Sequence, residues 1–359
     1  MSIPNRKGLF APSEFWRLVI VAVILICGLG TRLYDLTDPP LDYASTRQLR
    51  SAMIARGMYF SSLPDAPAWQ REIAVKQQQS HGMIEPEIIE AVTAITYRLV
   101  GGEYVWIARI YSSVFWVLGG LALYFLIRDL VSDDGAVIGL IYYLFVPFGL
   151  VASRTFQPDP LMTASCIFAW MGFNHWYRKR TWKWALLSGI FSGFSMLIKA
   201  TSIFFLLPGM AVVVIISKKL HHNLKDLQVW IIATLAALPA LIYHIYGIFI
   251  SGELESQFSG RFFPQMWQDP DFYLQWLNAV SKVAGHVIIL FIGLLGLALI
   301  KNRTDRAYLI AIWSGYLLYG FILSYHITSH YYYTLPLIPI LSVTLGAVAD
   351  WLILQLRKL

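Results

Sequence analysis

Ten apolar runs divide the chain, and most are close to the length of about 20 residues that a helix needs to cross a bilayer. The fifth run is shorter than the others. The runs cover residues 15–33, 104–127, 135–153, 160–177, 184–198, 201–217, 228–250, 284–300, 307–324 and 332–355. This pattern predicts an all-α polytopic membrane protein with about ten transmembrane helices.

The distribution of charge between the runs predicts the orientation of the chain. An apolar run near an N-terminus is either a first span or a cleaved signal peptide, and no small-x-small cleavage pattern precedes Arg32, so we interpret it as a span. With the N-terminus inside, basic clusters such as the one at 178–183 fall on the inner side, as the positive-inside rule requires. The sequence therefore predicts a protein of the cytoplasmic membrane with both termini in the cytoplasm.

Composition agrees with this class and excludes others. Hydrophobic residues make up 57% of the chain and charged residues only 14%, which is far from a soluble domain. A net charge of +7 would suit a nucleic-acid-binding protein, but here the basic residues form small clusters between apolar runs. Cys27 and Cys166 lie inside apolar runs, so a disulfide framework, a thiolate metal site or a thiol nucleophile has no support.

The first outer loop, residues 35–103, is too long to lack structure of its own. Ser45 and Gln48 form a capping-box pattern that predicts a helix ending near Gly57. A second helix is predicted from Pro86 to Gly101, with an apolar stripe on one side and charged residues on the other. Both are expected to be amphipathic helices beside the membrane, and the second would lie on its surface.

The outer segments also hold the candidates for chemistry. We find no internal repeat, P-loop, dinucleotide-binding glycine pattern, zinc spacing or nucleophile elbow. Ionisable residues at the outer ends of membrane helices are then the functional candidates. Asp42 follows Pro39-Pro40, so it is either a turn residue or a general base for an acceptor hydroxyl or amine.

Asp159 has two interpretations as well. Pro160 suits the first position of the fourth span, and Asp159 would then be its N-cap. Arg154 lies five residues earlier on the same short loop, which also makes a charge pair or a phosphate contact available.

Two cations interrupt apolar sequence. Arg109 lies inside the second span and Lys199 separates the fifth and sixth. Each either extends to the lipid headgroups or meets an anion, which could be Glu85, Asp159 or the phosphate of a lipid substrate. The segment of His330 and Tyr331 is either part of an interfacial aromatic belt or a contact for sugar or phosphate.

Several stretches, in this order, resemble the GT-C superfamily of membrane glycosyltransferases, in the branch of protein O-mannosyltransferases and aminoarabinose transferases. The resemblance runs from the first span to about the tenth. The stretches are PPLDYAS, RQLRSAMIARG, HGMIEPEIIEAVTAITYRLVGG, VWIARIYSSVFWVLGGLALYFLIRDL, RTFQPDPLMTASCIFAW, MLIKATSIFFLLPG and SHYYYTLPLIPIL.

The resemblance implies a function and a site. A sugar carried on a polyprenyl phosphate would be transferred, with inversion, to a lipid, glycan or protein acceptor on the outer face of the membrane. Asp42 would be the catalytic base and Asp159 a second catalytic carboxylate. The remaining expected contacts are Lys199, Arg109 and Arg154 to the donor phosphate and Glu85, His330 and Tyr331 to the substrates.

Two features depart from that family. Tyr43 follows Asp42 where much of the branch has Glu, so neither an obligatory metal nor another cofactor is expected. The chain ends soon after the tenth span, so residues 1–359 are expected to form a single transmembrane domain without a soluble C-terminal domain. Two other classes remain open, a transporter or lipid flippase and a non-catalytic membrane subunit that docks through its long loop.

Overall fold

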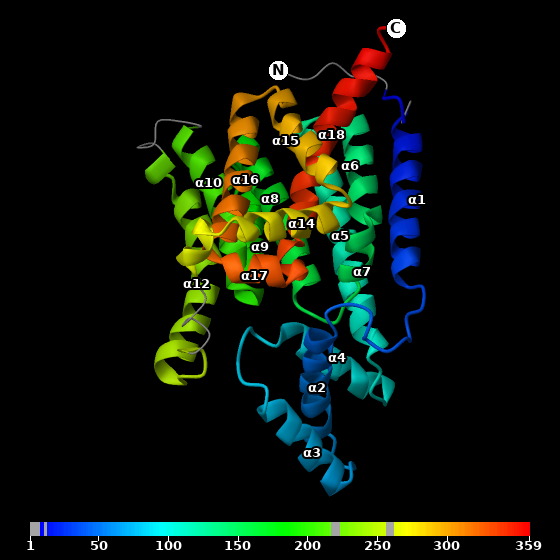
Figure 1. Cartoon of the computed structure of the whole chain (residues 1–359), viewed down its shortest axis with the longest axis vertical. Helices are drawn as coiled ribbons and strands as arrows, with labels where there is room; N and C mark the ends of the chain where they lie inside the picture. Colours follow the sequence, from blue (N-terminus) through cyan, green and yellow to red (C-terminus); the bar gives the residue numbers. More distant parts are fainter. Residues whose placement is uncertain (1–7, 11–12, 217–222, 256–261) are drawn as a thin grey trace.

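A computed structural model describes residues 8–10, 13–216, 223–255 and 262–359, which form helices and turns and include no β-strand. Most helices run roughly parallel in one bundle, and a smaller group of helices projects from one end of it (Figure 1). The first described residues and the C-terminal end of the chain lie together at the opposite end, where the backbone of Leu9 and the side chain of Arg357 both contact Asp134. The described chain therefore begins and ends on one side of the bundle, as an even number of spans predicts.

Each of the ten apolar runs contains a helix. The helices of the bundle are α1 (Glu14–Arg32), α5 (Trp106–Leu130), α6 (Asp133–Phe145), α7 (Pro147–Ala152), α8 (Asp159–Lys179), α9 (Trp182–Ile198), η1 (Ala200–Ser202), α10 (Ile203–Ile216), α12 (Leu227–Ile245), η2 (Tyr246–Ile250), η3 (Pro264–Gln268), α14 (Pro270–Ala284), α15 (Val287–Leu299), α16 (Arg303–Ile322), α17 (Ser324–Ser329), η4 (Tyr331–Thr334) and α18 (Leu337–Leu356).

Among the described helices, four are by themselves long and apolar enough to cross a membrane: α1, α5, α12 with η2, and η4 with α18. A fifth candidate is the pair α14 and α15, which is bent by 84° at its junction. The other apolar runs correspond to helices that are shorter, interrupted or less apolar. The count of ten spans therefore stays a prediction.

The helices of the bundle are held together by close contacts and by ion pairs at the end of the bundle opposite the projecting group. A Cβ atom at Gly193 would collide with the backbone of Leu235, and one at Gly315 with the backbone of Phe204, so these glycines let α9 approach α12 and let α16 approach α10. The ion pairs tie helix ends together: Arg17–Asp133 (2.8 Å), Arg357–Asp134 (3.6 Å) and Arg178–Asp305 (2.7 Å).

The projecting group consists of α2 (Ser45–Ser61), α3 (Ala68–Gln79) and α4 (Ile88–Val100), all from the first outer loop. Two of these helices were predicted and α3 was not. The predicted capping box is wrong, because the helix is preceded by Ala44 at φ 45° and no side chain caps it. Gly57 lies inside α2, where a Cβ atom would stand only 2.5 Å from that of Gln78 on α3. Gly101, at φ 81°, ends α4 as predicted.

The two faces of α4 differ from the prediction in one respect. Glu90 is buried against α2 and accepts a hydrogen bond of 2.7 Å from the Ser51 hydroxyl, so this charged residue is not on the outer side of the helix. The apolar residues Val92, Ile95 and Leu99 are exposed. An open apolar stripe fits a helix that lies on a membrane surface.

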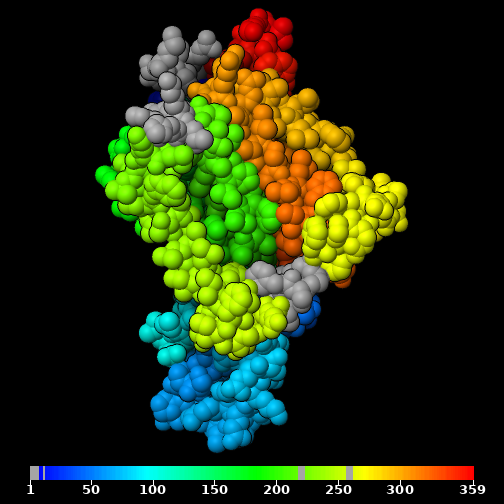
Figure 2. Space-filling view, turned by 90° about the vertical axis from the view of Figure 1, so that its left-hand side faces the viewer, coloured from blue at the N-terminus to red at the C-terminus, as the bar shows by residue number. Residues whose placement is uncertain are grey.

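One helix of the bundle reaches the projecting group. The far end of α12, continued by η2 and the residues up to 255, lies over the outer-loop helices (Figure 2). Tyr243 and Glu253 from this segment share a cavity with residues of α3 and of the loop before α4. This cavity therefore lies between the outer-loop helices and the end of α12.

Candidate functional site: charged clusters where the outer loop meets the bundle

The segment that carries Asp42 is fastened to the bundle by two arginines. Arg109 on α5 is buried, and its guanidinium donates to the carbonyl oxygens of Leu36 and Pro39 at 3.3 Å each. The same guanidinium lies 3.4 Å from Oδ1 of Asp42. Arg154, after α7, donates to the carbonyl oxygens of Tyr34 (2.6 Å) and Asp35 (2.8 Å). Two cations thus contact five groups of one loop, four backbone carbonyl oxygens and one carboxylate, which explains why the loop follows a defined path.

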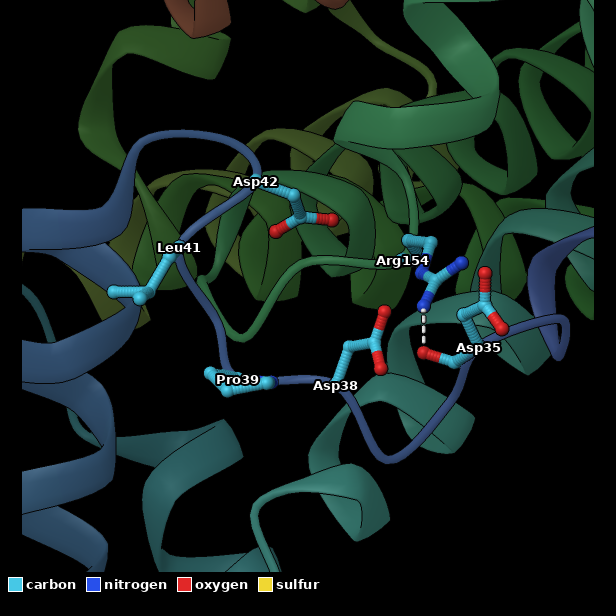
Figure 3. A pocket seen from close by; sticks show the side chains of 6 residues that line it. All are labelled: Asp35, Asp38, Pro39, Leu41, Asp42 and Arg154. Carbon is cyan, nitrogen blue, oxygen red and sulfur yellow. Dashed lines mark hydrogen bonds between the residues drawn. The ribbon is translucent and has the colours of Figure 1, made fainter.

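Asp42 opens onto a cavity of about 510 Å³. Its side chain is 41% exposed, although Arg109 beside it is almost completely buried. In Figure 3 the carboxylates of Asp38 and Asp42 and the guanidinium of Arg154 face the same space. The cavity is lined by Asp35, Asp38, Pro39, Leu41, Asp42 and Arg154. Asp42 therefore combines a fixed position with an accessible carboxylate, the combination that a general base needs.

Asp159 is buried in an ion pair. It is the first residue of α8 and Pro158 is the N-cap, so the helix begins one residue earlier than a cap at Asp159 would imply. Its Oδ1 lies 2.7 Å from Nζ of Lys199, and the two side chains are 1% and 7% exposed. The partner of Asp159 is thus Lys199, while Arg154 binds backbone carbonyl oxygens instead.

Lys199 occupies a break between α9 and η1, where its extended backbone ends one helix before the next begins. Its ammonium lies 4.4 Å from the ring centre of Tyr333 and 5.1 Å from that of Tyr332, in addition to the Asp159 contact. Burial alone would lower the pKa of Lys199, but the carboxylate of Asp159 raises it above the ordinary lysine value. The side chain therefore stays a cation inside the protein.

A second ion pair adjoins the first. Arg47 on α2 lies 2.7 Å from Glu85. Burial would raise the pKa of Glu85, but Arg47 and, further away, Lys199 bring it below its ordinary value. Arg47 also interacts electrostatically with Asp159, which together with Glu85 raises the pKa of Arg47 against the effect of burial. We call these four residues, Arg47, Glu85, Asp159 and Lys199, the ion-pair network.

His330 and Tyr331 lie on different sides of the same short segment. The ring of His330 lies 5.5 Å from that of Tyr332 and 6.0 Å from that of Tyr333, which places it near the ion-pair network. Burial, followed by the charges of Lys199 and Arg47, lowers the pKa of His330 and favours its neutral form. The hydroxyl of Tyr331 instead accepts a hydrogen bond of 2.8 Å from Lys282 on α14. The tyrosines next in sequence, Tyr332 and Tyr333, are the ones that contact Lys199.

The Asp42 cavity and the ion-pair network are neighbours. Tyr43, directly after Asp42, has its pKa raised first by burial and then by the charge of Asp159. Among the described residues, neither the Tyr43 hydroxyl nor Oδ2 of Asp159 has a hydrogen-bond partner. The structure therefore brings the predicted residues into two adjoining groups, one around Asp42 and one around Lys199.

Glu85 also lines a larger cavity of about 800 Å³. This cavity separates the loop before α4 from the end of α12 and is lined by Ser61, Val75, Gln78, Gln79, Gly82, Met83, Glu85, Pro86, Glu87, Tyr243 and Glu253. In the part of the chain that the structure describes, no group of three or more His, Cys, Asp or Glu residues is arranged to hold a metal ion.

Comparison with known proteins agrees with this architecture. The family model of dolichyl-phosphate-mannose-protein mannosyltransferases matches residues 85–246. ArnT from Cupriavidus metallidurans bound to undecaprenyl phosphate superposes with a TM-score of 0.63 at 18% identity, over 94% of this chain and 60% of ArnT; its apo state gives 0.63 at 17%, over 93% and 59%. The chain has the GT-C fold. This confirms the fold that the order of its stretches predicted.

Other GT-C structures are similar at greater distance. The oligosaccharyltransferase AglB from Archaeoglobus fulgidus, in complex with an inhibitory peptide and a dolichol-phosphate, matches with a TM-score of 0.56 at 13% identity, over 96% of this chain and 52% of AglB. The chain thus spans about three fifths of the length of ArnT. No curated protein sequence matches it. Its fold and its apolar helices make it a membrane protein.

Three residues of these charged clusters were not predicted from the sequence. Arg47 pairs with Glu85, Tyr333 covers Lys199, and Gln48 contacts Asp42. A signal for Arg47 was present, since a cation in the first turn of a helix opposes the helix dipole and calls for an anionic partner. The contact of Gln48 joins residues of separate segments, which no local pattern encodes.

Proposed function

We propose that this GT-C protein is a glycosyltransferase of the cytoplasmic membrane that moves a sugar from a polyprenyl-phosphate donor to a lipid, glycan or protein acceptor. The cavity of Asp42 would face outward and both termini would lie in the cytoplasm. The observation that carries the proposal is the accessible carboxylate of Asp42, fixed at the junction of outer loop and bundle beside the two cations of the ion-pair network, the buried Lys199 and the partly buried Arg47. The bound polyprenyl phosphate of ArnT and dolichol-phosphate of AglB support this choice of donor.

The proposed reaction is a single displacement. An acceptor oxygen or nitrogen forms a bond to the anomeric carbon while the bond from that carbon to the phosphate oxygen breaks, so the configuration inverts. Asp42 takes the proton of the acceptor. The phosphate leaves on the lipid with the bonding electrons, and fixed cations nearby stabilise the charge that develops on it.

The charged residues divide this work between them. Lys199 and Arg47 are the two cations of the ion-pair network, and we assign the donor phosphate to them. Glu85 and Asp159 hold those two cations in place through contacts of 2.7 Å each. Arg154 lines the Asp42 cavity and is assigned a contact with the substrate there.

Three further residues complete the assignment. Arg109, which is buried, is assigned the role of holding Asp42 in position. His330, neutral beside the network, and Tyr331 on the adjoining segment are assigned to the sugar.

A lipid flippase is the competing function, because it would also bind a polyprenyl phosphate within a helical bundle. A transporter usually places its polar binding groups near the middle of the membrane and moves them between the two sides. In this chain the accessible carboxylate of Asp42 lies instead on the segment between α1 and α2, at the end of the bundle from which α2, α3 and α4 project (Figure 1). This position favours chemistry at one surface.

The two functions are separated by one experiment. Purified protein in lipid nanodiscs would be given short-chain polyprenyl phosphates that carry radiolabelled hexoses, pentoses or aminopentoses, together with membrane extracts as a source of acceptors. A transferase releases free polyprenyl phosphate and moves label to the acceptor. Intact donor at all times in nanodiscs, combined with movement of donor between the leaflets of proteoliposomes, would show a flippase instead.

A further inference from the structure

Gln48 is a buried amide that touches both of the segments that carry the proposed catalytic carboxylates. It lies on the first turn of α2, with no exposed surface. Its Nε2 donates to the carbonyl oxygen of Tyr43 at 2.6 Å and to Oδ1 of Asp42 at 3.3 Å. Its Oε1 accepts a hydrogen bond of 3.1 Å from the backbone N–H of Phe156, on the loop that leads to Asp159. One side chain therefore joins two loops that are more than a hundred residues apart in sequence.

The orientation of this amide follows from its partners. A backbone N–H can only donate and a backbone carbonyl can only accept, so Phe156 fixes the oxygen of Gln48 and Tyr43 fixes the nitrogen. The amide consequently presents a donor, and not an acceptor, to the carboxylate of Asp42. A hydrogen bond to an ionised carboxylate is stronger than one between neutral groups, and it favours one orientation of the carboxylate.

Within the described part of the chain, the two side chains that contact the carboxylate of Asp42 approach the same oxygen. Gln48 from α2 and Arg109 from α5 approach Oδ1 at 3.3 Å and 3.4 Å. Oδ2 is left as the oxygen that can accept a proton from a substrate in the cavity. The two donors come from separate helices, so the carboxylate is held from two directions.

We propose that Gln48 is a positioning residue, which sets the carboxylate of Asp42 in register with the loop of Phe156 and Asp159. This role rests on the proposed function, since it concerns the base of that reaction. Small displacements of a reacting group lower the rate of a chemical step by about a hundredfold while binding groups elsewhere are unchanged. Gln48 should therefore act on kcat and leave the KM for the donor unchanged.

Two substitutions test this role. Gln48→Glu keeps an oxygen for the N–H of Phe156 but offers no donor to Asp42 or Tyr43. Gln48→Asn keeps a neutral amide but is one methylene too short to reach both loops. We expect both variants to lower kcat by about 10- to 100-fold with the donor KM within about twofold of wild type. Steady-state release of polyprenyl phosphate measures both parameters.

The matched control is Ser51→Ala. Ser51 is also buried on α2 and also donates to the outer loop, through its 2.7 Å bond to Glu90, but it does not touch Asp42. This variant should lower the melting temperature and keep wild-type kcat. Loss of kcat in Ser51→Ala equal to that in the Gln48 variants would show that only the stability of α2 matters, and would overturn the proposal.

A double variant identifies the residue through which Gln48 acts. If it acts through Asp42, adding Gln48→Asn to Asp42→Asn should lower the residual rate by less than twofold, because the base is already lost. Full additivity, or wild-type kcat in both single variants, would overturn the role of Gln48. An inactive wild-type protein would instead overturn the proposed function, and the role of Gln48 with it.

Discussion

Replacing Asp159 by asparagine should destabilise the protein more than any other single carboxylate removal at the site. The substitution keeps the shape of the side chain but leaves the ammonium of Lys199 without the carboxylate 2.7 Å away. Both side chains are almost fully buried, so water cannot replace the lost partner. An uncompensated buried charge is among the few changes with a large effect on stability.

The magnitude follows from the surroundings of Lys199. Removing one partner of a buried ion pair costs about 3–5 kcal/mol. The rings of Tyr332 and Tyr333 remain beside the ammonium and retain about 1–2 kcal/mol of attraction, which leaves a net loss of roughly 1–4 kcal/mol. Replacing both partners with apolar residues, as in Asp159→Leu with Lys199→Met, should recover most of this loss, because no charge is then left buried.

Thermal unfolding of purified protein in detergent measures the effect, with Asp65→Asn as the control. Asp65 is an exposed carboxylate on the same outer loop, and its removal should leave the melting temperature unchanged. The reasoning is refuted if Asp159→Asn melts with the wild type, or if the double variant is less stable than Asp159→Asn. Either result would mean that the pair is hydrated or separated in the folded protein.

Three other predictions concern the outer loop. Burial raises the pKa of Glu90 from 4.5 to about 7. The protonated carboxyl therefore stabilises the folded state below about pH 4.5, and this contribution is lost as the pH rises through 7. At pH 8 the free energy of unfolding of Glu90→Gln should exceed that of wild type by on the order of 3 kcal/mol and its melting temperature should be higher, whereas at pH 4 the two proteins should melt at the same temperature. Gly57→Leu should cost about 1–3 kcal/mol by pushing α3 away at Gln78, and an unchanged melting temperature would contradict the close contact of α2 and α3. Arg47→Met should raise the donor KM about 10- to 100-fold in the release assay, through loss of a charge-assisted phosphate contact; an unchanged KM would remove Arg47 from the phosphate site.

The helices of the bundle could be predicted because lipid and a buried core impose the same apolar requirement on each span. That rule does not reach the outer loop. The segment of α3 reads AWQREIAVKQQQ, with too few apolar residues for a clear periodic stripe. The segment of α14 falls between the apolar runs 228–250 and 284–300 and is not among the predicted spans, although Phe272, Trp276, Val280 and Val283 bury one face of this helix against the bundle. Both helices are fixed by tertiary contacts.

The site was predictable to the extent that charge in apolar sequence is conspicuous. Asp42, Asp159 and Lys199 stand out because each is an ion beside a membrane helix. The sequence left both Arg154 and Lys199 as possible partners of Asp159, and the structure shows that Asp159 binds Lys199, 40 residues away. Gln48 resembled a capping residue, because the sequence does not reveal that its amide bonds to Phe156 across 108 residues.

The central claim is that Asp42 is the base of a sugar transfer, and the most direct test is the rate of polyprenyl phosphate release by Asp42→Asn beside that of Asp65→Asn. The asparagine keeps the size of the side chain and an acceptor for Gln48 and Arg109 but cannot take up the proton. General-base removal costs about 100- to 10,000-fold in rate, so Asp42→Asn should lose at least about a hundredfold in kcat while it remains folded and binds the donor. Asp65→Asn should turn over at the wild-type rate. A folded Asp42→Asn protein with wild-type kcat would contradict the account.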